Sequence, residues 1–372
     1  MAELDLKRQE KAKAYAKAVR RLSFVELGLS GILILMLLLT PLSASLRDVL
    51  DFPQPLRVAF YFASLMIFLG IASAPLSFYG GFVIPRRFGL LSQNLRSWLF
   101  DGMKRGTLGF LLGIGIIVCV YLLLGSFPDL WWLFAAVFLV LLTVVMSNLA
   151  PIIIIPLFYK LEPLTDASLR ERLERITERA KTRVRGVFTI NLSSKATTGN
   201  AALIGFGNTR RVVLGDTILD RYSPEEIEVI MAHELGHHVH HDITKLIALQ
   251  SAIILVGFYL VHLTLKLGVP YFNFKGIDDV AAFPLLAGVL GVFALLLEPL
   301  VNAYRRHIEG SADEYALTLT ANPMGFITMM TKLTNQNLSE AQPSRWVELL
   351  FYDHPAYSKR VARALSYEKR QK

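Results

Sequence analysis

The chain has 372 residues, of which 53% are hydrophobic, and its mean hydropathy is +0.45. This composition excludes an ordinary soluble domain, because the apolar residues are concentrated in runs long enough to cross a bilayer. The net charge of +9 gives no reason to expect a nucleic-acid partner, since its distribution follows the loops between the apolar runs. The single cysteine, Cys119, excludes an internal disulfide and a cysteine-based zinc site.

Six apolar segments are each long enough to span a hydrocarbon core about 30 Å thick. A buried core helix would explain one such segment, but it does not explain six. A basic stretch at residues 1–21 precedes them, and we expect it to form a helix along the membrane surface. The first apolar segment is longer than the apolar region of a cleavable signal peptide, so we expect it to be retained. The predicted spans are 27–46, 58–82, 107–128, 131–158, 246–265 and 280–303.

The distribution of Lys and Arg predicts how these spans are oriented. Seven Lys and Arg residues precede the first span, and the segments 83–106 and 160–245 are also rich in them. The loops on the other side, at 47–57, 126–130 and 266–279, carry few. The positive-inside rule therefore places both termini and the segment 160–245 in the cytoplasm.

After the fourth span the sequence becomes that of a soluble domain. Apolar residues recur with a period of 3.6 at 163–183, which predicts an amphipathic helix. Short β-branched runs then predict strands at 187–192, 201–204 and 211–214. Ser223, followed by Pro224 and two glutamates, is a typical N-cap and opens the next helix.

That helix carries His233-Glu234-Leu235-Gly236-His237. Positions i and i+4 lie on one face of a helix, so the two imidazoles can bind one zinc ion. The glutamate between them can act as general base toward an attacking water. The pattern predicts a zinc-dependent hydrolase, although five residues alone also match by chance.

A zinc peptidase needs a third protein ligand, and Glu309 is the leading candidate. Glu309 and Asp313 are again i and i+4 on a predicted helix, so Asp313 could accept a hydrogen bond from His233 while Glu309 binds the metal. His307 is a rival ligand on a different face of that helix. Two predicted crossings separate His237 from Glu309, and an even number returns the chain to the starting side, so the site can close.

Several segments together resemble the integral-membrane zinc metallopeptidases typified by the type I CAAX prenyl endopeptidases, the a-factor-converting protease family of gluzincins. The resemblance covers nearly the whole chain beyond the first span. The segments that carry it are 86–90 with 93–94, 200–206 with 211–217, 233–237, 309–313, and His354-Pro355 with Arg360.

The resemblance implies a role for each matching residue. It implies zinc (Zn²⁺) bound by His233, His237 and Glu309, with Glu234 as base. It also implies roles for residues outside the segments 233–237 and 309–313. Asn200 and Ala201 would lie at a strand edge that receives an extended peptide. His354 and Arg360 would stabilise the oxyanion. Asp313 completes the expected catalytic set.

The chain departs from this family in two ways. Eukaryotic members have seven spans, whereas six are predicted here, so that one early span is missing. The family usually has tryptophan after the second zinc histidine and serine before the His-Pro pair, where this chain has His238 and Asp353. These differences bear on substrate preference more than on zinc chemistry.

We therefore expect a mainly α-helical, polytopic membrane protein with about six spans. Residues 1–159 would form a membrane region with four spans, and residues 160–372 a small α+β, zincin-like domain that faces the cytoplasm and includes a transmembrane hairpin at about 246–303. Its expected function is that of a zinc metalloendopeptidase resembling CAAX prenyl proteases, acting on peptide or protein substrates at the bilayer. The alternatives are a quality-control metallopeptidase for membrane proteins and, in another class, a non-catalytic zinc-binding scaffold or transporter.

Overall fold

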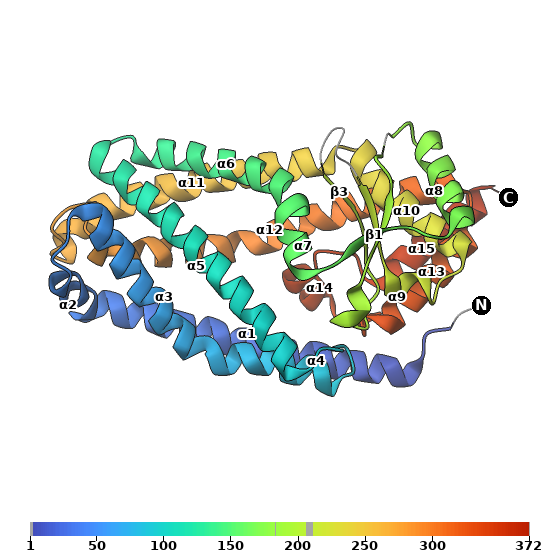
Figure 1. Cartoon of the computed structure of the whole chain (residues 1–372), viewed down its shortest axis with the longest axis horizontal. Helices are drawn as coiled ribbons and strands as arrows, with labels where there is room; N and C mark the ends of the chain where they lie inside the picture. Colours follow the sequence, from blue (N-terminus) through green and yellow to red (C-terminus); the bar gives the residue numbers. More distant parts are fainter. Residues whose placement is uncertain (1–2, 183, 206–210, 372) are drawn as a thin grey trace.

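The computed structural model describes residues 3–182, 184–205 and 211–371. Long helices run along the long axis of the molecule, and a small sheet with short helices lies at one end (Figure 1). Both termini lie at this same end (Figure 1).

Six helical segments among the described residues are long and apolar enough to cross a membrane, as the sequence predicted. Side chains such as Leu267 and Leu296 are 75% and 72% exposed, and their outward, apolar surface is that of a lipid-facing helix. Inside the bundle, Tyr61, Trp131 and Val261 belong to a buried apolar cluster. The six segments are Leu6–Leu39, Gln54–Arg87, Leu95–Ser126, Trp131–Phe158, Asp242–Tyr271 and Val280–Thr320.

The basic stretch at residues 1–21 is helical from Leu6, as expected, but it does not lie along the membrane surface as a helix of its own. Helix α1 runs without a break over Leu6–Leu39, and the predicted first span ends early because Pro41 cannot continue a helix. The polar half of α1 packs against the small domain: Arg8 Nε donates to the carbonyl of Asn335 at 2.8 Å. No proline lies between residues 6 and 39, so the polar stretch and the span form one continuous helix.

Short helices and π-turns complete the membrane region. The helix α2 (Leu42–Val49) connects α1 to α3 (Gln54–Phe78), which continues through the π-helical segment Tyr79–Val83 into α4 (Ile84–Arg87). The remaining elements are α5 (Leu95–Ser126), α6 (Trp131–Leu149), the π-helical segment Ala150–Ile154 and α7 (Ile155–Phe158).

The small domain contains a four-stranded sheet of order β1-β2-β4-β3. Strand β2 (Val187–Ile190) pairs antiparallel with β1 (Leu161–Pro163) and parallel with β4 (Arg211–Gly215). Strand β3 (Ala201–Ile204) pairs antiparallel with β4, with Ala201 opposite Leu214. Among the described residues β3 has β4 as its one neighbouring strand, so its other edge is open to them.

The helix predicted at 163–183 is shorter than expected. It is α8 (Ala167–Arg179), capped by the Asp166 carboxylate, and residues 161–163 form β1 instead. Arg183, the end of the predicted helix, lies outside the described residues. Strand β2 likewise ends at Ile190.

The remaining helices of the domain pack around a buried apolar core that includes Leu173, Met231 and Phe326. They are α9 (Asp216–Leu219), α10 (Pro224–Val239), α13 (Pro323–Gln336) and α15 (Tyr357–Gln371), together with the domain end of α12 (Phe283–Thr320). The short helix α14 (Arg345–Phe351) lies outside this core and packs against α12. Helix α11 (Asp242–Tyr271) leads from the domain into the membrane region, and α12 returns.

Candidate metal centre and substrate cleft

The candidate site forms where α10 crosses α12. Helix α10 begins at a complete capping box, in which Ser223 and Glu226 each bond the other's backbone N–H. Gly236 brings the two helices close together, because a Cβ atom at this position would lie 3.0 Å from the Cα of Ala312. This close approach places the histidines of α10 opposite the carboxylates of α12.

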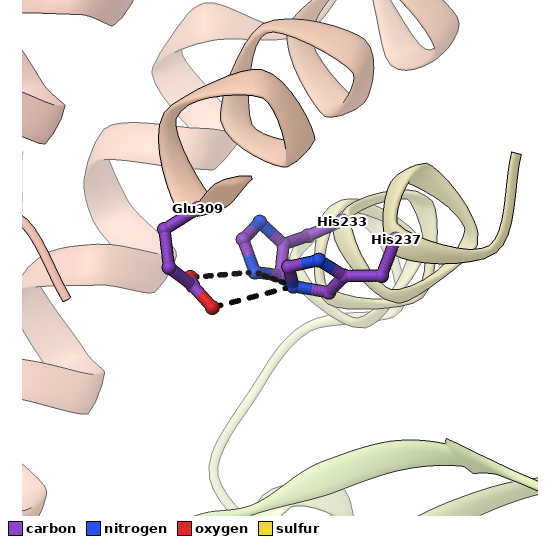
Figure 2. A group of neighbouring side chains, drawn as sticks. All are labelled: His233, His237 and Glu309. Carbon is purple, nitrogen blue, oxygen red and sulfur yellow. Dashed lines mark hydrogen bonds and ion pairs between the residues drawn. The ribbon is translucent and has the colours of Figure 1, made fainter. Parts of the chain in front are cut away.

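Three side chains converge there with the geometry of a metal site (Figure 2). His233 Nε2 lies 3.2 Å from His237 Nε2 and 3.3 Å from Glu309 Oε2, and His237 Nε2 lies 3.4 Å from Glu309 Oε1. A tetrahedral zinc ion with bonds of about 2.1 Å holds its ligand atoms about 3.4 Å apart. Glu309 Oε2 is buried and accepts no hydrogen bond among the described residues, which suits a metal ligand. His307, the rival ligand, does not belong to this cluster.

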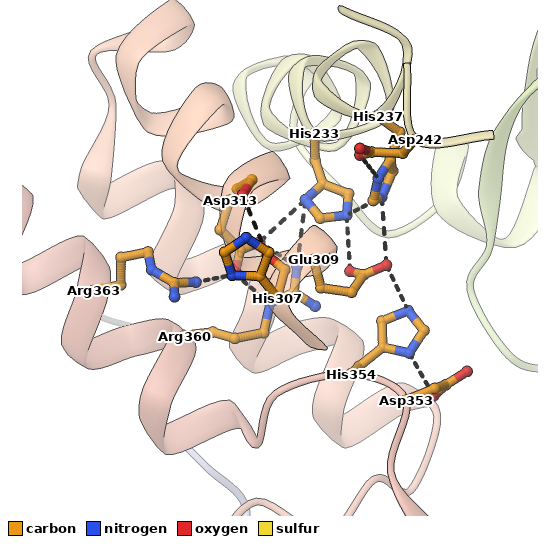
Figure 3. Close-up of polar contacts among 11 residues, drawn as sticks. His233, His237, Asp242, His307, Glu309, Asp313, Asp353, His354, Arg360 and Arg363 are labelled. Carbon is orange, nitrogen blue, oxygen red and sulfur yellow. Dashed lines mark hydrogen bonds and ion pairs between the residues drawn. The ribbon is translucent and has the colours of Figure 1, made fainter. Parts of the chain in front are cut away.

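Each histidine is backed by a carboxylate on its other nitrogen (Figure 3). His233 Nδ1 lies 3.1 Å from Asp313 Oδ1, so the expected contact is present, and His237 Nδ1 lies 3.1 Å from Asp242 Oδ2. Such partners fix which ring nitrogen carries the proton and leave the other free for a metal. The chain therefore orients both imidazoles toward Glu309.

Asp313 is fully buried and held by two arginines. Arg360 Nε donates to Asp313 Oδ2 at 2.9 Å, Arg360 Nη2 donates to Asp313 Oδ1 at 2.5 Å, and Arg363 Nη1 lies 3.2 Å from Oδ2. Arg360 is itself only 7% exposed, and its Nη2 lies 3.5 Å from His233 Nδ1. The structure thus places Arg360 behind the first histidine, with its guanidinium bound to Asp313.

Burial and the neighbouring carboxylates shift the pKa of His233 in opposite directions. Burial lowers the pKa of the His233 imidazole, but its contacts with the carboxylates of Asp313 and Glu309 outweigh burial and raise the pKa to about 9. Without a bound metal, the imidazole would therefore be protonated at neutral pH.

Glu234 lies beside the cluster and outside the set of metal ligands. Burial raises the pKa of its carboxyl group, and the positive charges of His233 and His237 and a backbone hydrogen bond from Leu203 only partly offset this effect. A carboxyl group with a raised pKa is a better proton acceptor than a solvated one. The hydrogen bond from Leu203 also places Glu234 beside strand β3.

His354 approaches the cluster from the loop between α14 and α15. Its Nε2 lies 3.3 Å from Glu309 Oε1, and its Nδ1 lies 2.7 Å from Asp353 Oδ1 (Figure 3). The hydrogen bond with His354 holds the pKa of Asp353 below its usual value. The His354 side chain is 54% exposed, so it borders the site on a side that solvent can reach.

Two cavities meet at the cluster. The larger, of about 650 Å³, follows the open edge of the sheet past Asn200 and Ala201 and is bounded by α1 and α13. The smaller, of about 250 Å³, lies toward α11 and α12. Glu234 and His354 line both cavities, so a chain that passes from one to the other crosses the cluster.

Comparison with known proteins identifies the family. The model of peptidase family M48 matches residues 163–368, which is more than half of the chain, and the model described as "CAAX prenyl protease N-terminal, five membrane helices" matches residues 1–160. The chain belongs to peptidase family M48. It is therefore a metallopeptidase, and its fold makes it an integral, multi-pass membrane protein.

Several relatives of this M48 peptidase match along most of their length. A CAAX prenyl protease 1 homolog from Oryza sativa subsp. japonica is 30% identical over 81% of this chain and 72% of its own. The CAAX prenyl protease 1 of Saccharomyces cerevisiae is 28% identical over 83% of this chain and 74% of its own. The uncharacterized metalloprotease YhfN of Bacillus subtilis is 27% identical over 95% of this chain and 84% of its own.

The fold of this M48 peptidase is also that of a solved relative. The crystal structure of S. mikatae Ste24p superimposes with a TM-score of 0.88, covering 97% of this chain and 90% of its own, at 21% sequence identity. Within the matched residues 1–160, the structure contains four candidate spans among the residues it describes, whereas the family description names five helices.

Two residues of the M48 site were missed by sequence reasoning. Asp242 follows His237 by five positions, but His241 takes a left-handed conformation, with φ of 56°, between the helices that carry them. The turn, not a helical period, brings Asp242 back to His237. Arg363 is the second, and its spacing of three residues from Arg360 was the only signal available.

Proposed function

We propose that this M48 peptidase is a zinc endopeptidase that cleaves peptide bonds at the cytoplasmic face of a membrane. The observation that carries the proposal is the position of Glu234, a half-buried base beside three converging metal donors at the junction of two cavities. An intact base argues against a purely structural zinc site in a scaffold or transporter, because such a site does not use one.

In this proposal His233, His237 and Glu309 hold the zinc, and Asp313 and Asp242 orient the two imidazoles. When bound, zinc would polarise the substrate carbonyl and make a water molecule more acidic. Glu234 accepts the proton of the attacking water and passes it to the leaving amine.

The substrate would bind as an additional strand on β3. Its open edge begins at Asn200 and Ala201 and leads past Leu203 toward Glu234. His354, held by Asp353, then donates to the developing oxyanion. Arg360 supports this step mainly through Asp313, because its guanidinium is bound to that carboxylate.

We propose C-terminal CAAX-type prenylated peptides as the first substrates to test. Support comes from the curated relatives named CAAX prenyl protease 1, two of which share 28% and 30% of their aligned residues with this chain. The alternative substrate is an unprenylated, misfolded membrane protein.

The basic loops support a cytoplasmic site with both termini on the same side. We also propose the division into a membrane region, 1–159, and a catalytic domain, 160–372.

The test compares wild type with Glu234→Gln on a farnesylated CAAX peptide and on a misfolded membrane protein without a prenyl group. Glu228→Gln is the matched control, since it changes a partly exposed glutamate on the same helix. We expect Glu234→Gln alone to abolish cleavage. Equal cleavage by wild type and Glu234→Gln would contradict the catalytic role of Glu234. Cleavage of only the unprenylated protein by wild type would replace the CAAX assignment with quality control.

A further inference from the structure

Helix α14 has its apolar side chains on the outside and its acid on the inside. Trp346 is 72% exposed, and Leu349 and Leu350, three and four positions later, are exposed on the same face. Glu348 is only 5% exposed. This arrangement is the inverse of a helix on a water-facing surface, and it suits a helix that contacts the acyl chains of a lipid.

The position of α14 agrees with that environment. The lipid-facing residues of α12, such as Leu296 and Leu300, end shortly before Arg306. Asn302 Nδ2 donates to the carbonyl of Leu350 at 3.2 Å, and Arg306 Nη1 donates to the carbonyl of Glu348 at 2.9 Å. These bonds hold α14 at the level where the apolar part of α12 ends. Figure 1 shows α14 near the same level along the long axis as α4 and α7, which are the domain-side ends of other spans.

A surface cavity of about 340 Å³ beside α14 is rich in positive charge. Of the described residues that line it, Arg306, Arg345 and Lys359 are basic and Glu348 is acidic. The Glu348 carboxylate is already bound by Lys359 Nζ at 2.6 Å and by the backbone N–H of Ala356 at 3.1 Å. Three cations and one anion leave the cavity with a net charge of +2.

Of the three cations that line the cavity, Arg345 is the one without a bonded partner among the described residues. It makes no hydrogen bond or ion pair with any residue that the structure describes, whereas Arg306 and Lys359 both bind α14. Trp346 and Leu349 complete the lining of the same cavity, so its charged part and its apolar part are contiguous. An anion with an attached hydrocarbon chain matches both parts.

We propose that α14 is an interfacial membrane helix and that its cavity binds the phosphate of an anionic phospholipid. Arg345 and Arg306 contact the phosphate, while Trp346, Leu349 and Leu350 lie among the acyl chains near the headgroup. The lipid also stabilises the active-site loop, because Glu348 binds Ala356 and Arg306 Nη1 donates to the carbonyl of Tyr352 at 2.5 Å, on either side of His354.

The test measures lipid binding to the full-length protein in detergent by native mass spectrometry. Wild type is titrated with phosphatidylglycerol and, separately, with zwitterionic phosphatidylcholine of the same acyl chains. We expect phosphatidylglycerol to bind more tightly, and Arg345→Gln to weaken its binding about fivefold, the effect of one cation near an anionic membrane surface. Arg175→Gln, which changes an exposed arginine on α8, is the matched control and should bind as wild type does.

Two results would overturn the proposal. One is the same affinity for phosphatidylglycerol in Arg345→Gln and in wild type. The other is full displacement of the lipid by an equal concentration of inorganic phosphate, because the apolar face of α14 would then contribute nothing to binding.

Discussion

The two histidines of the metal centre are supported in different ways. His233 is backed by Asp313, a fully buried carboxylate held by two arginines of α15. His237 is backed by Asp242, which is also buried but, in the part of the chain that the structure describes, has Lys245 at 3.0 Å as its one cationic partner. The first support joins three helices that are distant in sequence, and the second is a local turn. We expect the first to carry both stability and metal affinity, and the second mainly metal affinity.

Replacing Asp313 should have the largest effect. Asp313→Ala leaves the buried charge of Arg360 unpaired, which typically costs about 3–5 kcal/mol of stability. It also removes the orienting partner of His233, so zinc affinity should fall about 10- to 100-fold. Chemical unfolding and competition with a zinc chelator measure the two effects. The control is Glu314→Ala, which removes an exposed carboxylate one position along α12. Asp313→Ala with the stability of wild type would refute the role given to the arginine pair.

Separating the two helices should have the next largest effect. In Gly236→Ala the new Cβ would lie 3.0 Å from the backbone of Ala312, so α10 and α12 must move apart. Such overpacking costs about 1–3 kcal/mol, and zinc binding should weaken because the histidines move away from Glu309. Gly291→Ala is the matched control, since its Cβ would meet nothing within 4 Å. Equal stability of the two variants would show that close helix contact does not hold the site together.

The local support of His237 should affect metal binding more than folding. Asp242→Asn retains the shape of the side chain and removes its charge, and we expect zinc affinity to fall about tenfold with a smaller loss of stability than for Asp313→Ala. Asp220→Asn changes an exposed aspartate and serves as the control. The same chelator competition and unfolding measurements apply. A stability loss as large as that of Asp313→Ala would remove the distinction between the two supports.

Metal binding should depend on pH through His233. Its pKa is raised to about 9 in the metal-free protein, and the imidazole must lose its proton before it can bind zinc. Zinc affinity should therefore rise with pH, by about tenfold per unit below pH 9, and level off above it. Asp313→Asn should shift this profile to lower pH, since Asp313 helps to raise the pKa. A flat profile between pH 7 and pH 9 would contradict the protonation of His233.

The sequence predicts the parts of the molecule that depend on local patterns. Apolar runs predicted the six spans, and the spacing of His233 and His237 predicted that they share a helical face. The even number of crossings predicted that Glu309 returns to the same side. Each of these features follows from periodicity or from counting.

Features that depend on tertiary contact or on an unusual turn could not be predicted in this way. Asp242 reaches His237 only because His241 is left-handed. The hydrogen bonds of Arg360 to Asp313 join residues 47 positions apart. The continuity of α1, by contrast, could have been predicted from the sequence. Residues 6–39 contain no proline, which indicates one helix, whereas the change from polar to apolar residues suggested two.

The proposed mechanism gives two glutamates different roles: Glu309 holds the metal, whereas Glu234 transfers the proton. Zinc content and peptide cleavage, measured on wild type, Glu309→Gln and Glu234→Gln in parallel, test it most directly. We predict one zinc per chain in wild type and in Glu234→Gln, with cleavage lost in both variants and zinc lost only in Glu309→Gln. Full zinc content in Glu309→Gln, or cleavage by Glu234→Gln at the rate of wild type, would refute this division of roles.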